Sequence, residues 1–217
     1  MEKPLINILT RTSNRPNYFE NCFNSVKNQT YANINHIISV DDDTTENYVK
    51  KYTDNYIRVV RKNLNKGLKG IRRYAPYNLY LNDLKGQVKD GWIMFLDDDN
   101  GFINNQSLEN IVRHIVNVNQ LLLWQVKFPN KLIPEDIFFA KKMIKLNHFD
   151  MNGFMYNVKY NTVLFDDYSA GDYFYMTKLF PLIPEKVWIK DVFTKVQRNN
   201  MGGFGRRDDL IKKKVKK

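Results

Sequence analysis

Three consecutive aspartates, Asp97-Asp98-Asp99, directly follow the apolar run Trp92-Ile93-Met94-Phe95-Leu96. An apolar run of this length is typical of a buried strand, so we expect the triplet in the loop where the strand ends. Carboxylate oxygens are the ligands that Mg²⁺ and Mn²⁺ prefer, and both cations keep part of their coordination sphere for phosphate groups. The pattern predicts a divalent-metal site, and its simpler alternative is an acidic turn at a strand end.

A second acidic cluster, Asp41-Asp42-Asp43, follows the strand-like segment 34–40, and the polar loop Thr10-Arg11-Thr12-Ser13-Asn14 follows the strand-like segment 5–10. In an open α/β sheet, ligands bind beyond the carboxyl ends of the strands, where such loops meet. Like charges gathered there repel each other unless a cation or hydrogen-bond donors compensate them. The two clusters together therefore favour a cation-binding site over turn chemistry alone.

The elements that would position these loops alternate between strand and helix in the first half of the chain, which indicates an α/β sheet covered on both faces. The expected strands are 5–10, 34–40, 56–60, 92–97 and 121–126, followed by 153–158 and 162–165. The expected helices begin after Asn14-Arg15-Pro16, at Thr44 or Thr45, after Ser107 and near Ala170, and a last one covers 185–196. In the first of them Phe19, Cys22, Phe23 and Val26 recur at helical spacing and are expected in the core.

The composition suits one globular unit, because 217 residues with 43% hydrophobic content can bury a sizeable core. No apolar run reaches the length of a membrane-spanning helix, no secretion signal is recognisable, and the one cysteine excludes an internal disulfide, so we expect a cytoplasmic protein. The net charge is +11, and the segment 206–217 alone carries seven basic and two acidic residues. Its lysines, Lys212 to Lys217, could make weak contact with a membrane surface or form a solvated tail. Nucleic-acid binding is not expected, because the aromatic residues lie within apolar runs rather than among the basic ones.

The motifs occur in an order that resembles a known family, the nucleotide-diphospho-sugar transferases of the GT-A fold, in particular glycosyltransferase family 2. The resemblance rests on Ile8-Leu9-Thr10-Arg11, on Ser39-Val40-Asp41-Asp42-Asp43, on Asn65-Lys66-Gly67 with Arg72-Arg73 after it, and on 91–99 with the aspartate triplet. It covers about the first 100 residues. It implies a GT-A (Rossmann-like), mostly parallel sheet with helices on both faces and a smaller acceptor-side β/α region.

By this resemblance, particular residues receive roles in binding the donor. Thr10 and Arg11 would line the nucleotide pocket, and Asp41 or its neighbour Asp42 would accept a hydrogen bond from the base. Arg72 and Arg73 would approach the diphosphate. Asp97 and Asp98 would lie near the ribose and the metal, and the implied ligands of a Mn²⁺ or Mg²⁺ ion are Asp97 and Asp99.

The resemblance also implies a base in the second half, because inverting members need a carboxylate that deprotonates the acceptor hydroxyl. Asp172 is the candidate, with Asp166 and Asp167 as competitors, and an aspartate at the first turn of a helix is also common without any catalytic role. The glycine-rich segment 199–207 resembles a mobile loop over the donor, or is a linker. Many relatives place a late histidine on the metal, whereas here the last histidine of the chain is His148, which is expected to be structural.

With this resemblance, the sequence predicts a metal-dependent, inverting glycosyltransferase that moves a sugar from a nucleotide-diphosphate donor to a hydroxyl of a glycan. A UDP-sugar is the favoured donor, and a GDP-sugar is the other candidate. The alternatives are a sugar-phosphate nucleotidyltransferase and a non-catalytic domain that binds nucleotide sugars. Residues 1–205 would form the catalytic domain, with a donor half (1–100) and an acceptor half (101–205), and 206–217 would be a tail or linker.

Overall fold

The computed structural model describes residues 3–60 and 74–197. Its strands are β1 (Ile6–Arg11), β2 (Ile34–Val40), β3 (Tyr56–Arg58), β4 (Trp92–Phe95), β5 (Asn100–Phe102), β6 (Gln120–Lys127), β7 (Leu132–Ile133), β8 (Phe154–Asn157) and β9 (Glu185–Val196). Its helices are α1 (Pro16–Lys27), α2 (Asp43–Val49), α3 (Tyr77–Gln87), α4 (Ser107–Val112), α5 (Asp136–Ala140) and α6 (Gly171–Leu179).

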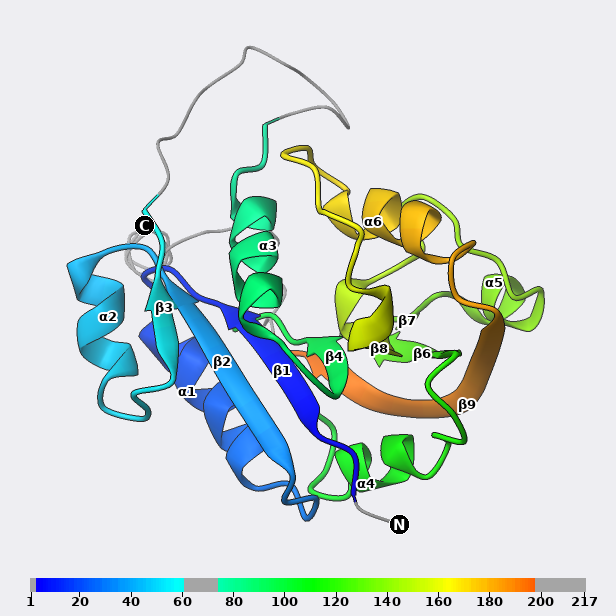
Figure 1. Cartoon of the computed structure of the whole chain (residues 1–217), viewed down its shortest axis with the longest axis horizontal. Coiled ribbons are helices and arrows are strands. Elements are labelled where there is room, and N and C mark those ends of the chain that lie inside the picture. Colours follow the sequence, from blue (N-terminus) through cyan, green and yellow to red (C-terminus); the bar gives the residue numbers. More distant parts are fainter. Residues whose placement is uncertain (1–2, 61–73, 198–217) are drawn as a thin grey trace.

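The strands form one sheet in the order β3-β2-β1-β4-β8-β6-β9-β5, with β7 paired to β6 (Figure 1). The first four of these are parallel, and β1 lies between β2 on one side and β4 on the other. The chain thus runs outward from β1 through β2 to β3, and then returns to form β4 on the other side of β1. Such a reversal of strand order opens a crevice at the strand ends, and ligands of α/β proteins bind there.

The second half of the sheet is mixed rather than parallel. Strand β8 runs antiparallel to both β4 and β6, β5 runs antiparallel to β9, and β6 runs parallel to β9. The expectation of an α/β sheet is confirmed: β3, β2, β1 and β4 form a continuous parallel part, and β6 and β9 add one further parallel pair.

Two expectations for the second half were wrong. The segment 185–196 is the strand β9, not a helix, because it pairs along its length with β6. The register of this pair shifts after Trp124, and the buried Ile189 and Phe193 lie four residues apart, a spacing that also fits a helix. The segment 162–165 is an irregular connection whose Val163 and Phe165 reach into the core. In both places tertiary packing, rather than a local period, determines which side chains are buried.

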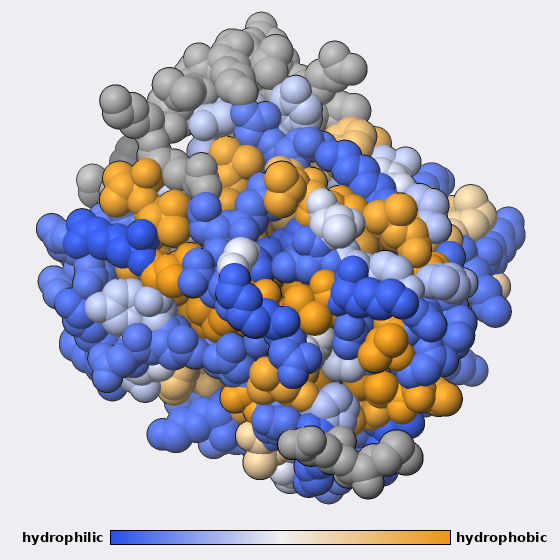
Figure 2. Space-filling view, viewed as in Figure 1, coloured by the Kyte–Doolittle hydropathy of each residue, from blue (hydrophilic) through white to orange (hydrophobic). Residues whose placement is uncertain are grey.

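The surface shown in Figure 2 carries hydrophobic residues in small groups separated by hydrophilic ones. None of the helices within the described residues is long and apolar enough to cross a membrane. The large hydrophobic side chains that are exposed include Val60, Val116 and Leu164.

Helices pack on both faces of the sheet, as expected. On one face, Leu81 of α3 and Met176 of α6 pack with Leu9 and Phe95. On the other, Cys22 and Val26 of α1 and Ile111 of α4 pack with alternate residues of β1 and β4. Successive side chains of a strand point to opposite faces, so β1 and β4 serve both layers and are buried throughout.

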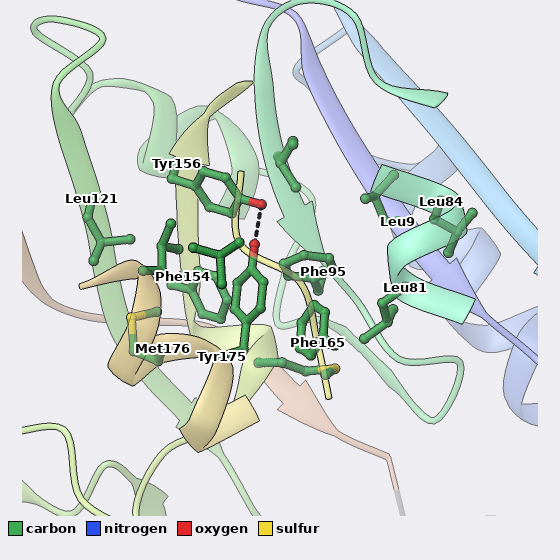
Figure 3. Packing of buried hydrophobic residues seen from close by; sticks show 14 of the residues in the cluster. Leu9, Leu81, Leu84, Phe95, Leu121, Phe154, Tyr156, Phe165, Tyr175 and Met176 are labelled. Carbon is green, nitrogen blue, oxygen red and sulfur yellow. Dashed lines mark hydrogen bonds between the residues drawn. The ribbon is translucent and has the colours of Figure 1, made fainter. Parts of the chain in front are cut away.

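An aromatic group joins α6 to the sheet (Figure 3). The hydroxyl groups of Tyr156 and Tyr175 lie 2.6 Å apart, and the rings of Phe165 and Tyr175 stack with centroids 3.9 Å apart. These contacts bury Tyr175 completely. Because Tyr175 follows the start of α6 by one helical turn, they also fix the position of Asp172.

Candidate functional site

The loop after β1 and the loop after β4 meet through an arginine and an aspartate. Since β1 and β4 are adjacent and parallel, Arg11 and Asp97 emerge side by side from their carboxyl ends. Arg11 Nε donates to Asp97 Oδ1 over 2.9 Å, and its terminal nitrogens reach the carbonyl of Tyr77 at 2.9 Å and Asn78 Oδ1 at 3.2 Å. The guanidinium also lies over the Tyr77 ring, 4.8 Å from its centroid. Four groups from two segments, the loop after β4 and the start of α3, thus hold Arg11 in place.

A second arginine, Arg15, holds the other two aspartates of the triplet. Its Nε donates to Asp98 Oδ2 over 3.0 Å, its Nη1 donates to Asp99 Oδ2 over 3.0 Å, and its Nη2 pairs with Asp98 Oδ1. Thr12 Oγ1 donates to the same Asp98 carboxylate over 2.8 Å. The side chains of Asp98 and Asp99 are only 0% and 2% exposed, so this arginine is the compensating charge that buried carboxylates require.

The electrostatics of this pair reflect its burial. Burial raises the pKa of the Asp98 carboxyl to about 7, and the Arg15 guanidinium opposes that rise. The three carboxylates in turn raise the pKa of Arg15, although burial acts in the opposite direction. Arg15 therefore stays charged, and it favours the ionised form of Asp98.

Asp42, which the family resemblance placed near the base, is the N-cap of α2. Its Oδ1 accepts from the Thr45 N–H at 2.7 Å and its Oδ2 accepts from Asn14 Nδ2 at 2.6 Å. The expected cap at Thr44 or Thr45 is thus replaced by a cap at Asp42, one of the side chains most often found there. Thr45 Oγ1 also donates to Asp41 Oδ1 over 3.2 Å, so both aspartates of this cluster contact Thr45.

Thr10 supports the site from within the sheet. It is fully buried, and its hydroxyl donates to the carbonyl of Leu96 over 2.8 Å and lies 2.9 Å from His36 Nε2. These contacts fix the end of β4 directly before the aspartate triplet. Thr10 thus supports the segment before the aspartate triplet from within the sheet.

Asp172 lies in the first turn of α6. Its pKa is raised to about 7, mainly by burial and then by the negative charges of Asp150 and Asp97, whereas the Tyr173 N–H and Arg11 act in the opposite direction. These influences place Asp172 within electrostatic range of the Arg11–Asp97 pair. Its competitor Asp166 forms an ion pair with Lys178 at 2.7 Å, which gives that carboxylate a structural partner.

Two residues of this region, Asp150 and Asn152, have no signal in the sequence. Asp150 Oδ1 accepts from the backbone N–H of Asn152 at 2.9 Å and from its Nδ2 at 2.6 Å, and Asn152 Oδ1 accepts from the Asp97 N–H at 2.7 Å. Asn152 thus links the start of the triplet to a second acidic residue, whose pKa burial raises to about 6. Neither residue could be found from spacing, because both lie in an irregular turn more than fifty residues after the triplet.

The remaining residues that the sequence singled out do not contribute to the described site. Arg72, Arg73 and the segment 199–207 fall outside the described residues. His148 lies 3.2 Å from Glu135 Oε1 and packs on the Phe138 ring at 4.4 Å, so its contacts are those of a structural histidine.

The donor set suits a cation that brings its own additional ligands. Within residues 3–60 and 74–197, no group of three or more His, Cys, Asp or Glu side chains could hold a metal ion by itself. Mg²⁺ and Mn²⁺ are commonly held by one or two carboxylates, with phosphate oxygens and water completing the shell. Asp97 and Asp99 fit that requirement in type and number, and both are engaged by arginine.

Comparison with known proteins places this arrangement in a family. The model of glycosyl transferase family 2 matches residues 8–129, which is more than half of the chain. No curated protein matches the sequence.

Solved structures with the same fold include crystal structures of S. aureus TarS 1-349, of which the UDP complex has a TM-score of 0.69 at 18% identity over 88% of this chain. The TarS 1-349 complex with UDP-GlcNAc gives 0.65 at 16% identity over 94%. The mannosyltransferase PcManGT from Pyrobaculum calidifontis with GDP-Man and Mn²⁺ gives 0.65 at 15% identity over 93%. This chain spans only 59–60% of those structures. From the matched family model and the shared fold, we conclude that the chain belongs to glycosyl transferase family 2 and has the GT-A fold.

Proposed function

We propose that this protein transfers a sugar from a nucleotide-diphosphate donor to a hydroxyl group of a glycan acceptor, with the help of a divalent cation and with inversion at the anomeric carbon. The observation that carries the proposal is the position of Asp172, because the charges of Asp97 and Arg11 both act on the pKa of its carboxyl group. A candidate base thus lies within electrostatic range of the residues expected to hold the donor diphosphate.

Solved structures with this fold favour a UDP-sugar as the donor. The TarS 1-349 structures contain UDP and UDP-GlcNAc, and the PcManGT structure contains GDP-Man and Mn²⁺. We extend the class of ligand to this chain, a nucleotide diphosphate sugar, with UDP preferred over GDP. Residues 1–205 are proposed to form the catalytic domain, and their partners to be the donor and the glycan acceptor.

The chain's own residues divide the reaction between two sides of the crevice. On the donor side, Asp97 and Asp99 would hold Mn²⁺ or Mg²⁺, and Arg11 orients Asp97 through its fixed guanidinium. A bound cation would act as a Lewis acid that neutralises charge on the leaving nucleoside diphosphate. On the acceptor side, Asp172 accepts the proton of the acceptor hydroxyl as its oxygen bonds to the anomeric carbon. The bond from that carbon to the diphosphate oxygen breaks on the opposite side, and this geometry inverts the anomeric configuration.

Burial of Asp172 suits it to this task. A carboxylate of ordinary pKa is a weak base, and a base is most effective when its pKa is near the working pH. Its raised pKa of about 7 leaves a large fraction ionised at neutral pH while increasing its affinity for a proton.

A thermal-shift panel tests the donor side. UDP-, GDP-, CMP- and dTDP-linked sugars are each added with and without Mn²⁺, because a ligand that binds only the folded state raises the melting temperature. We expect a Mn²⁺-dependent rise confined to one nucleotide, UDP first, and its loss in Asp99→Asn. If no nucleotide sugar raises the melting temperature under either condition, the proposed function is wrong. A rise with free nucleoside triphosphates only would instead indicate the nucleotidyltransferase.

A further inference from the structure

The aspartate triplet already has its cations within the chain. Arg11 pairs with Asp97, and Arg15 pairs with Asp98 and Asp99. With all three carboxylates ionised, the five groups carry a net charge of −1 (2 − 3). A divalent cation that binds at Asp99 must therefore compete with a guanidinium that is already there.

The two arginines are anchored differently. Arg11 donates to Tyr77 and Asn78 as well as to Asp97, so it has several partners besides its aspartate. Among the described residues, the side-chain bonds of Arg15 go to Asp98 and Asp99, two to the first and one to the second. Loss of the single bond to Asp99 would leave Arg15 still held on the buried Asp98 by its two-nitrogen fork, an arrangement that gives arginine pairs their strength and fixed geometry.

We propose that Arg15 is a positioning residue of the aspartate triplet, which holds Asp99 in place before the donor binds and releases it when a divalent cation arrives with the donor diphosphate. The proposal rests on the proposed function, because it takes Asp99 to be the residue that the cation needs. It adds that the chain itself keeps its affinity for the free metal low.

The charges give the reason for this order. A cation alone would bring two positive charges to a site with a net charge of −1 and would also have to displace Arg15 from Asp99. A cation accompanied by a diphosphate brings two negative charges with it, and the phosphate oxygens also offer Arg15 a new partner. Binding of the metal and of the nucleotide should therefore be strongly coupled, and Arg15 should be a main source of that coupling.

The test measures Mn²⁺ binding without any nucleotide, from the loss of the electron paramagnetic resonance signal of free Mn²⁺. We expect Arg15→Gln to bind Mn²⁺ roughly tenfold or more tightly than wild type, because a positive charge in contact with the ligand carboxylate has been removed. With UDP present, the affinity of wild type should rise much more than that of the variant. The control is Arg113→Gln, which removes an exposed arginine whose ion pair, in the part of the chain that the structure describes, is with Glu109, and it should bind like wild type.

Arg15→Lys provides a second variant, since it keeps a cation beside the buried Asp98 and is expected to fold even if Arg15→Gln does not. Lysine lacks the fork that spans both carboxylates, so Asp99 should be easier to release and Mn²⁺ should again bind more tightly than in wild type. If a folded Arg15 variant binds Mn²⁺ no more tightly than wild type, the proposal is wrong. Because the first titration contains only the protein and Mn²⁺, it can show tighter Mn²⁺ binding by the Arg15 variants even where the donor panel shows no binding of a nucleotide sugar.

Discussion

At the scale of single residues, the site is organised by carboxylates whose environments differ. Asp98 is buried against Arg15 and Thr12, and Asp97 is held by Arg11. Asp172 and Asp150 have no ion-pair partner within the part of the chain that the structure describes, and burial raises the pKa of both. Carboxylates that are paired with an arginine suit a binding role, and carboxylates without an ion-pair partner suit proton transfer.

The reaction should depend on pH through Asp172. The base acts only when ionised, and its pKa is raised to about 7, so activity is lost as the pH falls through that value. We expect kcat/KM to fall about tenfold per pH unit below the apparent pKa. Since Asp150 contributes to the raised pKa of Asp172, the variant Asp150→Asn should move this limb to lower pH. Identical pH profiles for the two proteins would contradict the assignment.

Part of the candidate site could be predicted before the structure. The aspartate triplet and the strand end that carries it follow from order along the chain, and Arg11 follows from the family resemblance. The contribution of Arg15 could not, because a residue beside Pro16 at a helix start looks like part of a cap until the fold brings it to Asp98. Asp150 and Asn152 are further cases, since only the three-dimensional turn joins them to Asp97.

At the scale of elements, the start of α6 controls where Asp172 lies. Ala170, which precedes the helix, has a left-handed backbone with φ of 57°. Gly171 packs directly against the amide of Asn78, and that amide also binds the carbonyl of Tyr168 at 2.5 Å and accepts from Arg11. The first turn of α6, helix α3 and the donor-side arginine are thus joined at one close contact.

A pair of glycine variants tests this contact. In Gly171→Ala, the new methyl group would overlap with the Asn78 side chain, and overpacking of this kind costs roughly 1–3 kcal/mol of unfolding free energy. We expect lower stability and lower transferase activity, because Asn78 and Asp172 shift together. The matched variant Gly86→Ala is in α3 with open space around it, and should instead gain about 0.5–1 kcal/mol. Urea denaturation of both variants measures these changes in unfolding free energy. A Gly171→Ala variant with the stability and activity of wild type would contradict the role of the contact between Gly171 and Asn78.

Element prediction succeeded where a hydrophobic period was regular and failed where it was not. The strands up to β4 and the helix α1, with its buried Phe19, Cys22 and Val26, follow the sequence pattern closely. The strand β9 was mistaken for a helix, since its buried Ile189 and Phe193 lie four residues apart, a spacing that also fits a helix. Partners distant in sequence set that register, and no local window contains them.

At the scale of the whole molecule, a buried lysine connects the two halves of the chain. Lys85 of α3 is 2% exposed, its Nζ donates to the carbonyl of Val163, and it lies over the Tyr175 ring at 4.7 Å from the centroid. Burial lowers its pKa to about 7. Above this pH the folded protein therefore holds Lys85 mainly as the neutral amine.

The pH dependence of stability should reveal this lysine. Between pH 7 and 10.5 the unfolded chain binds the proton that the folded chain has lost, so unfolding free energy gains up to about 1.4 kcal/mol per pH unit from this group as pH rises. Lys85→Met should remove that gain, which urea denaturation at pH 7.5 and 9.0 can measure. The exposed control Lys89→Met should keep the dependence of wild type. If the unfolding free energy of Lys85→Met rises with pH as steeply as that of wild type, the lowered pKa of Lys85 is contradicted.

The central claim, that Asp172 is the base of a nucleotide-sugar transferase, is tested most directly by nucleoside diphosphate release. Wild type, Asp172→Asn and the control Asp166→Asn are given the donor identified by thermal shift, with Mn²⁺, and with water or glycans as acceptors. We expect Asp172→Asn to lose about 10²–10⁴-fold in turnover while its donor-induced melting shift persists, and Asp166→Asn, whose carboxylate pairs with Lys178, to match wild type. Unchanged release by Asp172→Asn would contradict the account.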